Sequence, residues 1–428
     1  MSLLRKLSDP ESWNRFCEYK SSLACPKDLE RELRAFLDSQ AYLSVCRLIE
    51  EGGRFPLPRK AVISKMHSQK KRTVYIYPRA ENTVLKLLTW LMLRRYDPLF
   101  SSNLYSFRPG TTAKDAMRRL TRLPGIRRMY SYKADISNYF NSIPVDRFLP
   151  RLREALQDDP ELFRFLESLL TEPEVLERGV PVREEKGIMA GTPLSAFYAN
   201  LYLRDLDRHF AEAHVPYARY SDDIILFARS REETEAHAAY LRQFLAENGL
   251  TLNPAKESFR TPEEGWAFLG FSCTGGILDI APASVEKLKG KMRRKTHALK
   301  RWQERNGLSG TQAAKAFIRI FNRKLLESAH DSDLSWSEWY FSVLQTTASL
   351  HTIDLYAQDC LRFLLSGKRT KARFDVRYGQ LKELGYRSLV HAYYAYRPEK
   401  EAQKKQPAED RAAGSKYLHP PVEVGGSD

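Results

Sequence analysis

The sequence has 428 residues, of which 43% are apolar, so it is long enough to form two or three domains with a substantial core. Lys and Arg outnumber Asp and Glu by 69 to 53, which gives a formal net charge of +16. Because phosphate groups attract Lys and Arg, this excess favours a polyanionic partner such as nucleic acid over a merely soluble basic protein.

The cysteines and the apolar stretches argue against several other classes of protein. The five cysteines are scattered without a CxxC pair, which speaks against a zinc site and a disulfide framework. The N-terminal segment MSLLRKLSDPESW is too polar for a signal peptide. The apolar stretch TVLKLLTWLML contains a Lys and is shorter than the roughly 20 residues that span a bilayer. We therefore expect a cytoplasmic protein without a membrane segment.

The first third of the chain is predicted to be mostly helical. Residues 1–50 show helical spacing of apolar residues, with Leu29, Leu33 and Phe36 on one face. FPLPRK is predicted to be an extended linker, and KKRTVYIYP a strand with cations at its start. ENTVLKLLTWLMLRRYDPLF is predicted to form a helix that is buried on most sides.

The middle of the chain mixes strands and helices. SYKADISNYFNSI is predicted to be a strand that runs into a turn, and residues 177–195 are predicted to be a loop before the helix SAFYANLYLRDLDRHF. YARY and IILFAR are short apolar runs on either side of an acidic turn, which indicates a β-hairpin. WAFLGFSC and GILDIAP are predicted to be two further strands. Strands and helices in this order predict an α+β fold and not a regularly alternating parallel sheet.

The last part of the chain changes in character. Residues 283–397 are predicted to be helical and rich in Lys, Arg and aromatic residues, which suits a nucleic-acid surface or, alternatively, a helical core with cations at its rim. Residues 398–428 are polar and rich in Pro and Gly, so they are predicted to be a disordered tail.

Three aspartates carry the chemical interpretation. Asp222 and Asp223 are adjacent at the predicted hairpin turn, where their repulsion favours a divalent cation with oxygen ligands, although a solvated Asp-Asp turn is equally compatible. Asp135 ends a second apolar strand just before a turn. A third carboxylate from a neighbouring strand could complete a site for two Mg²⁺ ions, with Mn²⁺ as a substitute.

Six ordered segments resemble one known family. ADISNYFNSI, GIMAGTPLSAFYANLYL, YSDDIILFA, LTLNPAKESF and AFLGF resemble motifs A to E of reverse transcriptases. LYSFRPGTTAKDA resembles a segment of group II intron-like bacterial enzymes, and the short chain resembles the defence-associated bacterial reverse transcriptases. The resemblance implies a right-hand polymerase fold with an N-terminal helical extension (1–60), fingers (61–130), a palm with interleaved fingers segments (131–280), a basic helical thumb (281–397) and the tail (398–428).

The resemblance also implies roles for the acidic residues and their neighbours. Asp135 and Asp222 match the principal metal ligands, and Asp223 matches a weaker or indirect one. Phe140, five residues after Asp135, matches the bulky gate that excludes a 2′-hydroxyl, with an ordinary core Phe as the alternative. Lys256 matches a lysine that protonates or neutralises departing pyrophosphate, with a surface Lys as the alternative.

Further residues match the nucleotide pocket of the family. The expected triphosphate cations are Lys71 and Arg72, with Lys65 as a substitute and a solvated charge run as the alternative. The other expected contacts to the incoming nucleotide and primer lie in motifs A, B and E and comprise Ile136, Gly191, Thr192 and the segment Phe268, Leu269, Gly270 and Phe271. Ala190 departs from the family, which commonly has Gln there, and Arg108 is expected either to contact template or to brace the fingers.

We therefore expect an RNA-directed DNA polymerase that adds dNTPs to a 3′-hydroxyl, copies a companion noncoding RNA into cDNA and serves in antiphage defence. One alternative is an untemplated or protein-primed DNA polymerase on the same fold, for which Tyr393, Tyr394 or Tyr396 could supply the priming hydroxyl. A second is a group II intron-derived reverse transcriptase. A third is a non-catalytic RNA-binding scaffold, which the presence of all three carboxylates disfavours.

Overall fold

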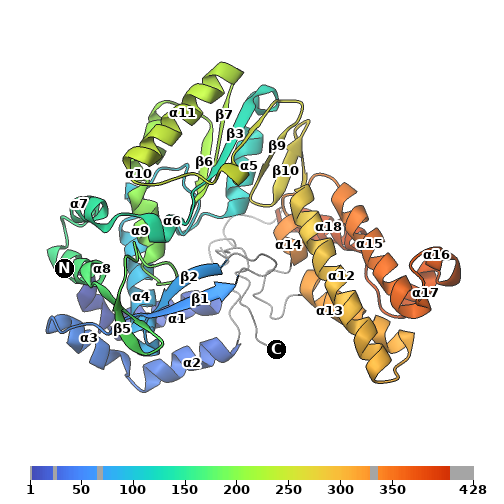
Figure 1. Cartoon of the computed structure of the whole chain (residues 1–428), viewed down its shortest axis with the longest axis horizontal. Coiled ribbons are helices and arrows are strands. Elements are labelled where there is room, and N and C mark those ends of the chain that lie inside the picture. Colours follow the sequence, from blue (N-terminus) through green and yellow to red (C-terminus); the bar gives the residue numbers. More distant parts are fainter. Residues whose placement is uncertain (1, 23–26, 65–70, 328–335, 405–428) are drawn as a thin grey trace. The chain divides into compact units, whose positions relative to one another are not determined.

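The computed structural model describes residues 2–22, 27–64, 71–327 and 336–404 (Figure 1). It divides into two compact units, Met1–Thr261 and Pro262–Asp428, which we describe separately. Lys65 lies outside the described residues. None of the helices in the described part of the chain has the length and apolar character needed to cross a membrane.

A helical layer begins the first unit, as the sequence predicts. Helix α4 is apolar on most sides and packs against α3 and the short η1 helix, which buries Leu85, Leu87 and Leu88 completely. Trp13 of α1 is buried next to Phe36 of α2, with ring centroids 5.9 Å apart. The elements are η1 (Leu3–Leu7), α1 (Pro10–Ser22), α2 (Lys27–Asp38), α3 (Tyr42–Glu50) and α4 (Arg79–Arg95).

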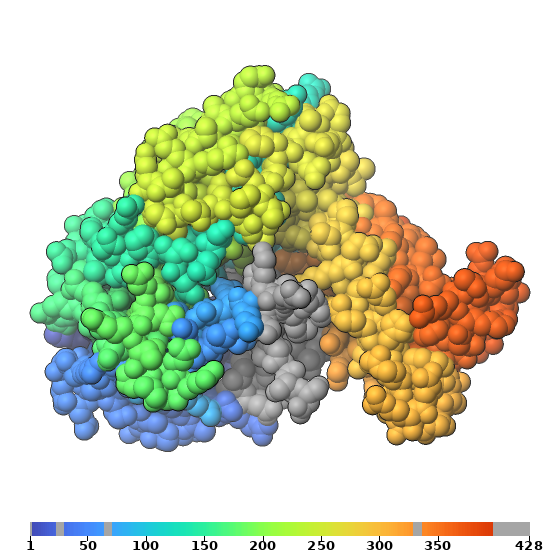
Figure 2. Space-filling view, viewed as in Figure 1, coloured from blue at the N-terminus to red at the C-terminus, as the bar shows by residue number. Residues whose placement is uncertain are grey.

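A four-stranded sheet in the order β2-β1-β4-β5 follows, formed by β1 (Arg59–Ser64), β2 (Lys71–Ile76), β4 (Glu174–Glu177) and β5 (Val180–Arg183). Figure 2 shows the β4–β5 hairpin (green) on the surface beside β1 (blue). The prediction of a loop over residues 177–195 is wrong for β5. Arg178 and Gly179 both have positive φ (53° and 87°), which makes a tight hairpin turn, and Pro181 is tolerated because β5 is an edge strand.

The second sheet of this unit has the order β6-β7-β3-β8 and is antiparallel throughout. Its strands are β3 (Tyr130–Asp135), β6 (Tyr217–Tyr220), β7 (Asp223–Ala228) and β8 (Ser258–Arg260). Helix α11 packs against β3 and β7, while α5 and α10 pack against β6, so most of β7 is buried. The predicted hairpin around Asp222 is therefore confirmed, and it lies in the middle of the unit.

The remaining elements connect these layers. The predicted helix over SAFYANLYLRDLDRHF is broken at Leu203 into α9 and α10. These elements are η2 (Asp97–Leu99), α5 (Ala113–Arg122), η3 (Ile126–Arg128), α6 (Tyr139–Ser142), α7 (Val145–Ala155), α8 (Pro160–Thr171), α9 (Ser195–Tyr202), α10 (Arg204–Glu212), α11 (Arg231–Glu247) and η4 (Pro254–Lys256).

The second unit combines a three-stranded sheet, in the order β11-β10-β9, with helices. Helices α12, α13 and α15 pack against one another. The elements are β9 (Trp266–Phe268), β10 (Phe271–Thr274), β11 (Ile277–Ile280), α12 (Pro282–Arg305), α13 (Gly310–Leu325), α14 (Trp336–Phe341), α15 (Ala348–Ser366), α16 (Ala372–Asp375), α17 (Tyr378–Glu383) and α18 (Leu389–Lys404).

Two boundaries differ from those expected. The small sheet belongs with the helices, because the Leu278 N–H donates to the Gln345 side chain at 2.9 Å and the rings of Phe271 and Tyr340 lie 5.1 Å apart. The chain therefore divides at residue 261, earlier than the expected end of the palm at residue 280. Helix α18 also continues to Lys404, past the expected start of the tail at residue 398. The α+β class is confirmed.

Candidate active site

Three carboxylates meet at one end of the β6-β7-β3-β8 sheet. Strands β3 and β7 run antiparallel, with Asp135 opposite Asp223 in register. Asp222 lies in the two-residue turn between β6 and β7, and its carbonyl accepts a hydrogen bond of 3.1 Å from the Ile136 N–H. The sheet register thus brings together the three acids that the sequence singled out, although Asp135 lies almost 90 residues before the other two in the chain.

Asp222 and Asp223 stand in an environment that disfavours their charged forms. Burial, with repulsion from Asp223 and Asp135, raises the pKa of Asp222 to about 6. Burial also raises the pKa of Asp223, although the Lys133 ammonium lies 3.5 Å from its carboxylate and opposes the shift. A cation placed between the carboxylates would relieve this cost.

Lys256 already supplies one such cation. It ends η4 on the segment that precedes β8, and its Nζ lies 2.5 Å from Oδ2 of Asp135. Burial alone would lower the pKa of Lys256. The hydrogen bond to Asp135 and the charges of the three carboxylates outweigh this effect and raise the pKa of this lysine. The Asn253 N–H donates to the Asp135 carbonyl at 2.8 Å, which fixes η4 beside the end of β3.

The donor chemistry of this cluster fits a hard divalent cation. Carboxylate oxygens are the ligands that Mg²⁺ and Mn²⁺ take in proteins, and Asp222 is costly to keep charged without one. In the described part of the chain, no three acidic, His or Cys side chains are arranged as a complete metal site.

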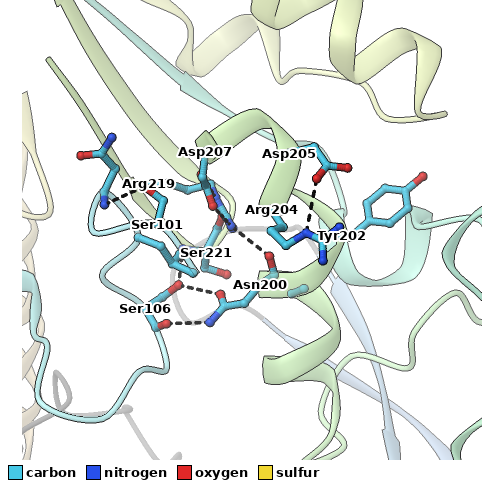
Figure 3. Close-up of polar contacts among 12 residues, drawn as sticks. Ser101, Ser106, Asn200, Tyr202, Arg204, Asp205, Asp207, Arg219 and Ser221 are labelled. Atoms are coloured by element: carbon cyan, nitrogen blue, oxygen red, sulfur yellow. Dashed lines mark hydrogen bonds and ion pairs between the residues drawn. The ribbon is translucent and has the colours of Figure 1, made fainter. Parts of the chain in front are cut away.

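A buried hydrogen-bond network holds the acidic turn in place (Figure 3). Ser221 adopts a left-handed conformation (φ 61°), and its N–H donates to Oγ of Ser106 at 2.9 Å. The same hydroxyl donates to Oδ1 of Asn200 at 3.1 Å, while Nδ2 of Asn200 donates to the Ser106 carbonyl at 2.8 Å. The turn is thereby attached to helix α9 and to the segment before α5.

A fully buried ion pair supports the same turn (Figure 3). Arg219 and Asp207 have no exposed side-chain surface, and Nε and Nη2 of Arg219 lie 2.8 and 2.5 Å from the two carboxylate oxygens of Asp207. Arg219 also donates to the carbonyls of Ser221 and Asn200, each at 3.2 Å. Neither residue was predicted from the sequence; Arg219 alone carries a signal, because it is the charged residue of the otherwise apolar strand YARY.

Phe140 lies near the cluster, in the short helix α6 that follows β3. Its ring is partly exposed, and the guanidinium of Arg72 on β2 lies 5.7 Å from the ring centroid. Lys71 and Arg72 both have exposed side chains. The structure therefore brings the expected gate residue together with one of the two expected phosphate cations.

The loop before α9 is tightly packed against β2. Gly191 has φ 96°, and a Cβ there would come within 2.9 Å of Cβ of Val74, so this position favours glycine on both counts. Thr192 is buried and its hydroxyl donates to the Met189 carbonyl, so its side chain turns inward. Ile136 is likewise buried, and its N–H is already used by Asp222.

Other expected site residues have structural roles or lie elsewhere. Arg108 forms a bidentate ion pair with Asp97, at 2.8 and 3.0 Å, and donates to the Ser101 carbonyl, so it braces its own loop. The segment 268–271 belongs to the second unit. The hydroxyl of Tyr393 is buried and donates to the Leu344 carbonyl at 2.9 Å, which counts against a priming role.

Comparison with known proteins agrees with this geometry. The family model "Reverse transcriptase (RNA-dependent DNA polymerase)" matches residues 63–273. The chain is 28% identical over 200 residues to the "Uncharacterized 91 kDa protein in cob intron" of Schizosaccharomyces pombe, covering 45% of this chain and 23% of that protein. It is 23% identical over 185 residues to the "Group II intron-encoded protein LtrA" of Lactococcus lactis, covering 42% and 30%.

The chain thus spans a quarter to a third of the length of these curated relatives. Among solved structures, apo telomerase from Candida tropicalis aligns with 77% of this chain and 69% of its own, at 11% identity and a TM-score of 0.45.

Proposed function

We propose that the chain is an RNA-directed DNA polymerase that adds dNTPs to a 3′-hydroxyl, because residues 63–273 match the reverse transcriptase family model. The observation that carries this proposal is the meeting of Asp135, Asp222 and Asp223 at the ends of β3 and β7. The match of the family model to residues 63–273 and the similarity to a group II intron-encoded protein support this proposal.

A reverse transcriptase domain implies dependence on a divalent cation, and we propose two Mg²⁺ ions held by Asp135 and Asp222, with Asp223 as an indirect ligand. When bound, the cations activate the attacking 3′-hydroxyl and neutralise the triphosphate. Lys256 contacts one oxygen of Asp135, Oδ2, at 2.5 Å. It thus lies close enough to the site to neutralise or protonate the departing pyrophosphate.

The neighbouring residues select and orient the nucleotide. Arg72 and Lys71 are exposed on β2 and can pair with the triphosphate. Phe140 presents a partly exposed ring beside Arg72, where it can exclude a 2′-hydroxyl by its bulk. Together these residues would favour a dNTP over an NTP.

The test of this proposal is incorporation by the purified protein. The protein is given Mg²⁺, labelled dNTPs or NTPs, and a primer annealed to RNA, with the primer alone as a control. We expect dNTP incorporation that requires the RNA and matches its sequence. Incorporation without a template would favour the untemplated alternative, and no incorporation with any primer or with Mn²⁺ would favour the non-catalytic scaffold.

We further propose that the template is a structured noncoding RNA, that synthesis takes place in the cytoplasm and that it serves antiphage defence. The net charge of +16 and the basic helix α12 support binding of a large RNA. A group II intron-derived enzyme is the second candidate, favoured by the similarity to an intron-encoded protein. Sequencing of the RNA that co-purifies separates the two, because the second predicts intron RNA and the first a short companion RNA.

A defence role has its own test in cells. Phage plating efficiency is compared between cells that express the wild type and cells that express the Asp222→Ala variant. We expect protection with the wild type only; equal plating with both proteins would contradict the defence role and leave the polymerase proposal standing.

A further inference from the structure

Asn141 connects three segments around the expected nucleotide pocket. It lies on α6, one residue after Phe140. Its Nδ2 donates to the Thr73 carbonyl on β2 at 3.1 Å, and its Oδ1 accepts from the Ala190 N–H at 2.9 Å. One carboxamide therefore links α6, β2 and the loop over residues 186–192, using both its donor and its acceptor.

The backbone around this side chain forms further links between the same three segments. The Phe140 carbonyl accepts from the Ile188 N–H at 2.9 Å, and the Ala190 carbonyl accepts from the Tyr75 N–H at 2.8 Å. A Cβ at Gly187 would lie 2.7 Å from the Phe140 carbonyl oxygen, so the loop passes in close contact with the backbone of α6. Asn141 contributes the side-chain links in this arrangement.

The loop is also fixed at its start. Lys186 is buried, and its Nζ donates to the carbonyls of Glu172 and Glu174 beside β4. Because this anchor does not involve α6, loss of the Asn141 carboxamide would loosen the middle of the loop without releasing the whole loop. A local effect on the pocket can thus be separated from a general loss of folding.

The positions that Asn141 links adjoin residues expected to contact the sugar and the triphosphate of the incoming nucleotide. Phe140 precedes it directly, and Arg72, whose guanidinium lies 5.7 Å from the Phe140 ring, precedes Thr73 on β2. Ala190 has no side-chain amide, and the carboxamide that reaches this point of the loop comes from Asn141. The Asn141 carboxamide thus adds side-chain links to the backbone hydrogen bonds that join α6, β2 and the loop.

We propose that Asn141 is a positioning residue for sugar selection, which holds Phe140 at a fixed distance from β2 and the 186–192 loop. This inference rests on the proposed polymerase function. It differs from a plain folding role because loss of the carboxamide changes the preference for dNTPs over NTPs.

The test compares Asn141→Leu, which removes both hydrogen bonds, with Asn141→Asp, which keeps the acceptor for Ala190 but turns a carboxylate oxygen toward the Thr73 carbonyl. Matched controls are Asn14→Leu and Asn14→Asp, at an exposed Asn of α1. For each variant, kcat/KM is measured for a dNTP and for the matching NTP, and amide hydrogen exchange is measured over residues 71–76 and 186–192.

We expect Asn141→Leu to lower the dNTP preference about tenfold and to speed exchange in both segments, with a smaller change for Asn141→Asp and none for the Asn14 variants. Unchanged preference in both Asn141 variants, with normal incorporation, overturns the inference while the polymerase function stands. If the leucine variant does not fold, the aspartate variant decides in the same way. If the wild type does not incorporate nucleotides, the polymerase function fails. Unchanged amide hydrogen exchange in the Asn141 variants would show that the carboxamide does not hold β2 and the loop in place.

Discussion

Phe140 is the single residue whose side chain is expected to separate the two sugars. Its ring is partly exposed beside Arg72 and also packs against the buried core, so truncation opens space at the pocket and removes some packing. Phe140→Ala should therefore admit NTPs, with a fall of about 10²-fold in the dNTP preference, comparable to removal of one steric contact in a pocket. Parallel incorporation assays with each nucleotide set measure this. An unchanged preference would leave Phe140 as an ordinary packing residue.

Lys256, together with Lys133 beside Asp223, supplies positive charge to the acidic cluster when no cation is bound. Replacing it by Met removes the ammonium that lies 2.5 Å from Asp135 and leaves the three carboxylates to repel one another. The stabilisation on adding Mg²⁺ should then exceed that of the wild type, by roughly 2 °C in Tm. Thermal unfolding with EDTA and with Mg²⁺ measures the difference. Lys289→Met, which breaks an ion pair with Glu286 in the second unit, is the control and should leave the Mg²⁺ response as in the wild type.

The element that matters most for the site is the β6–β7 hairpin, because its turn carries Asp222. The buried Arg219–Asp207 pair supports this turn, and Asp207→Asn leaves the guanidinium buried without its counter-charge. We expect a loss of about 3–5 kcal/mol in the free energy of unfolding. Asp205→Asn is the matched control on the same helix, because the Asp205 side chain pairs with Arg204 but is 43% exposed. This substitution should lower the free energy of unfolding by less than about 1 kcal/mol. Urea unfolding of both variants decides, and equal losses would contradict the account.

Sequence patterns predicted the elements that carry the acids, and they did so for physical reasons. Asp135 ends one apolar run, and Asp222 lies directly before another. Such apolar runs must be buried, so they become the adjacent central strands β3 and β7. The partners Asn141, Asp207 and Arg219 were missed. Nothing local in a sequence shows which polar side chain will be buried beside a backbone carbonyl from a distant segment.

The same limit applies to positions where the sequence suggested direct contacts with substrate. Thr192 is a polar residue within a matching motif, yet its hydroxyl donates to the Met189 carbonyl. For Arg108 the sequence left template contact and bracing open, and the structure shows contacts that brace its own loop. Ile136 is buried and its N–H is used by the acidic turn. These roles depend on side-chain direction, which periodicity does not specify at loop positions.

At the scale of the whole molecule, the excess of positive charge should govern RNA binding. Helix α12 has exposed cations, including Lys287, Arg293 and Lys295. Changing these three residues to Glu should weaken RNA binding. The slope of the logarithm of the association constant against the logarithm of the salt concentration should become shallower by about 3, because each phosphate that the protein no longer neutralises contributes roughly one unit. Binding measured by fluorescence anisotropy at several salt concentrations gives the slope. The control variant Lys6→Glu/Arg15→Glu/Lys382→Glu changes exposed cations on other helices and should keep the wild-type slope.

In the proposed function, the carboxylates at the ends of β3 and β7 carry the chemistry. The most direct measurement is dNTP incorporation on an RNA template by the wild type, by Asp135→Asn and by Asp222→Asn, with Asp205→Asn as a carboxylate control outside the cluster. We predict a loss of at least about 10³-fold for the two cluster variants, because each removes a cation ligand, and near-normal activity for the control. Incorporation at the wild-type rate by either cluster variant, with folding intact, would contradict the account.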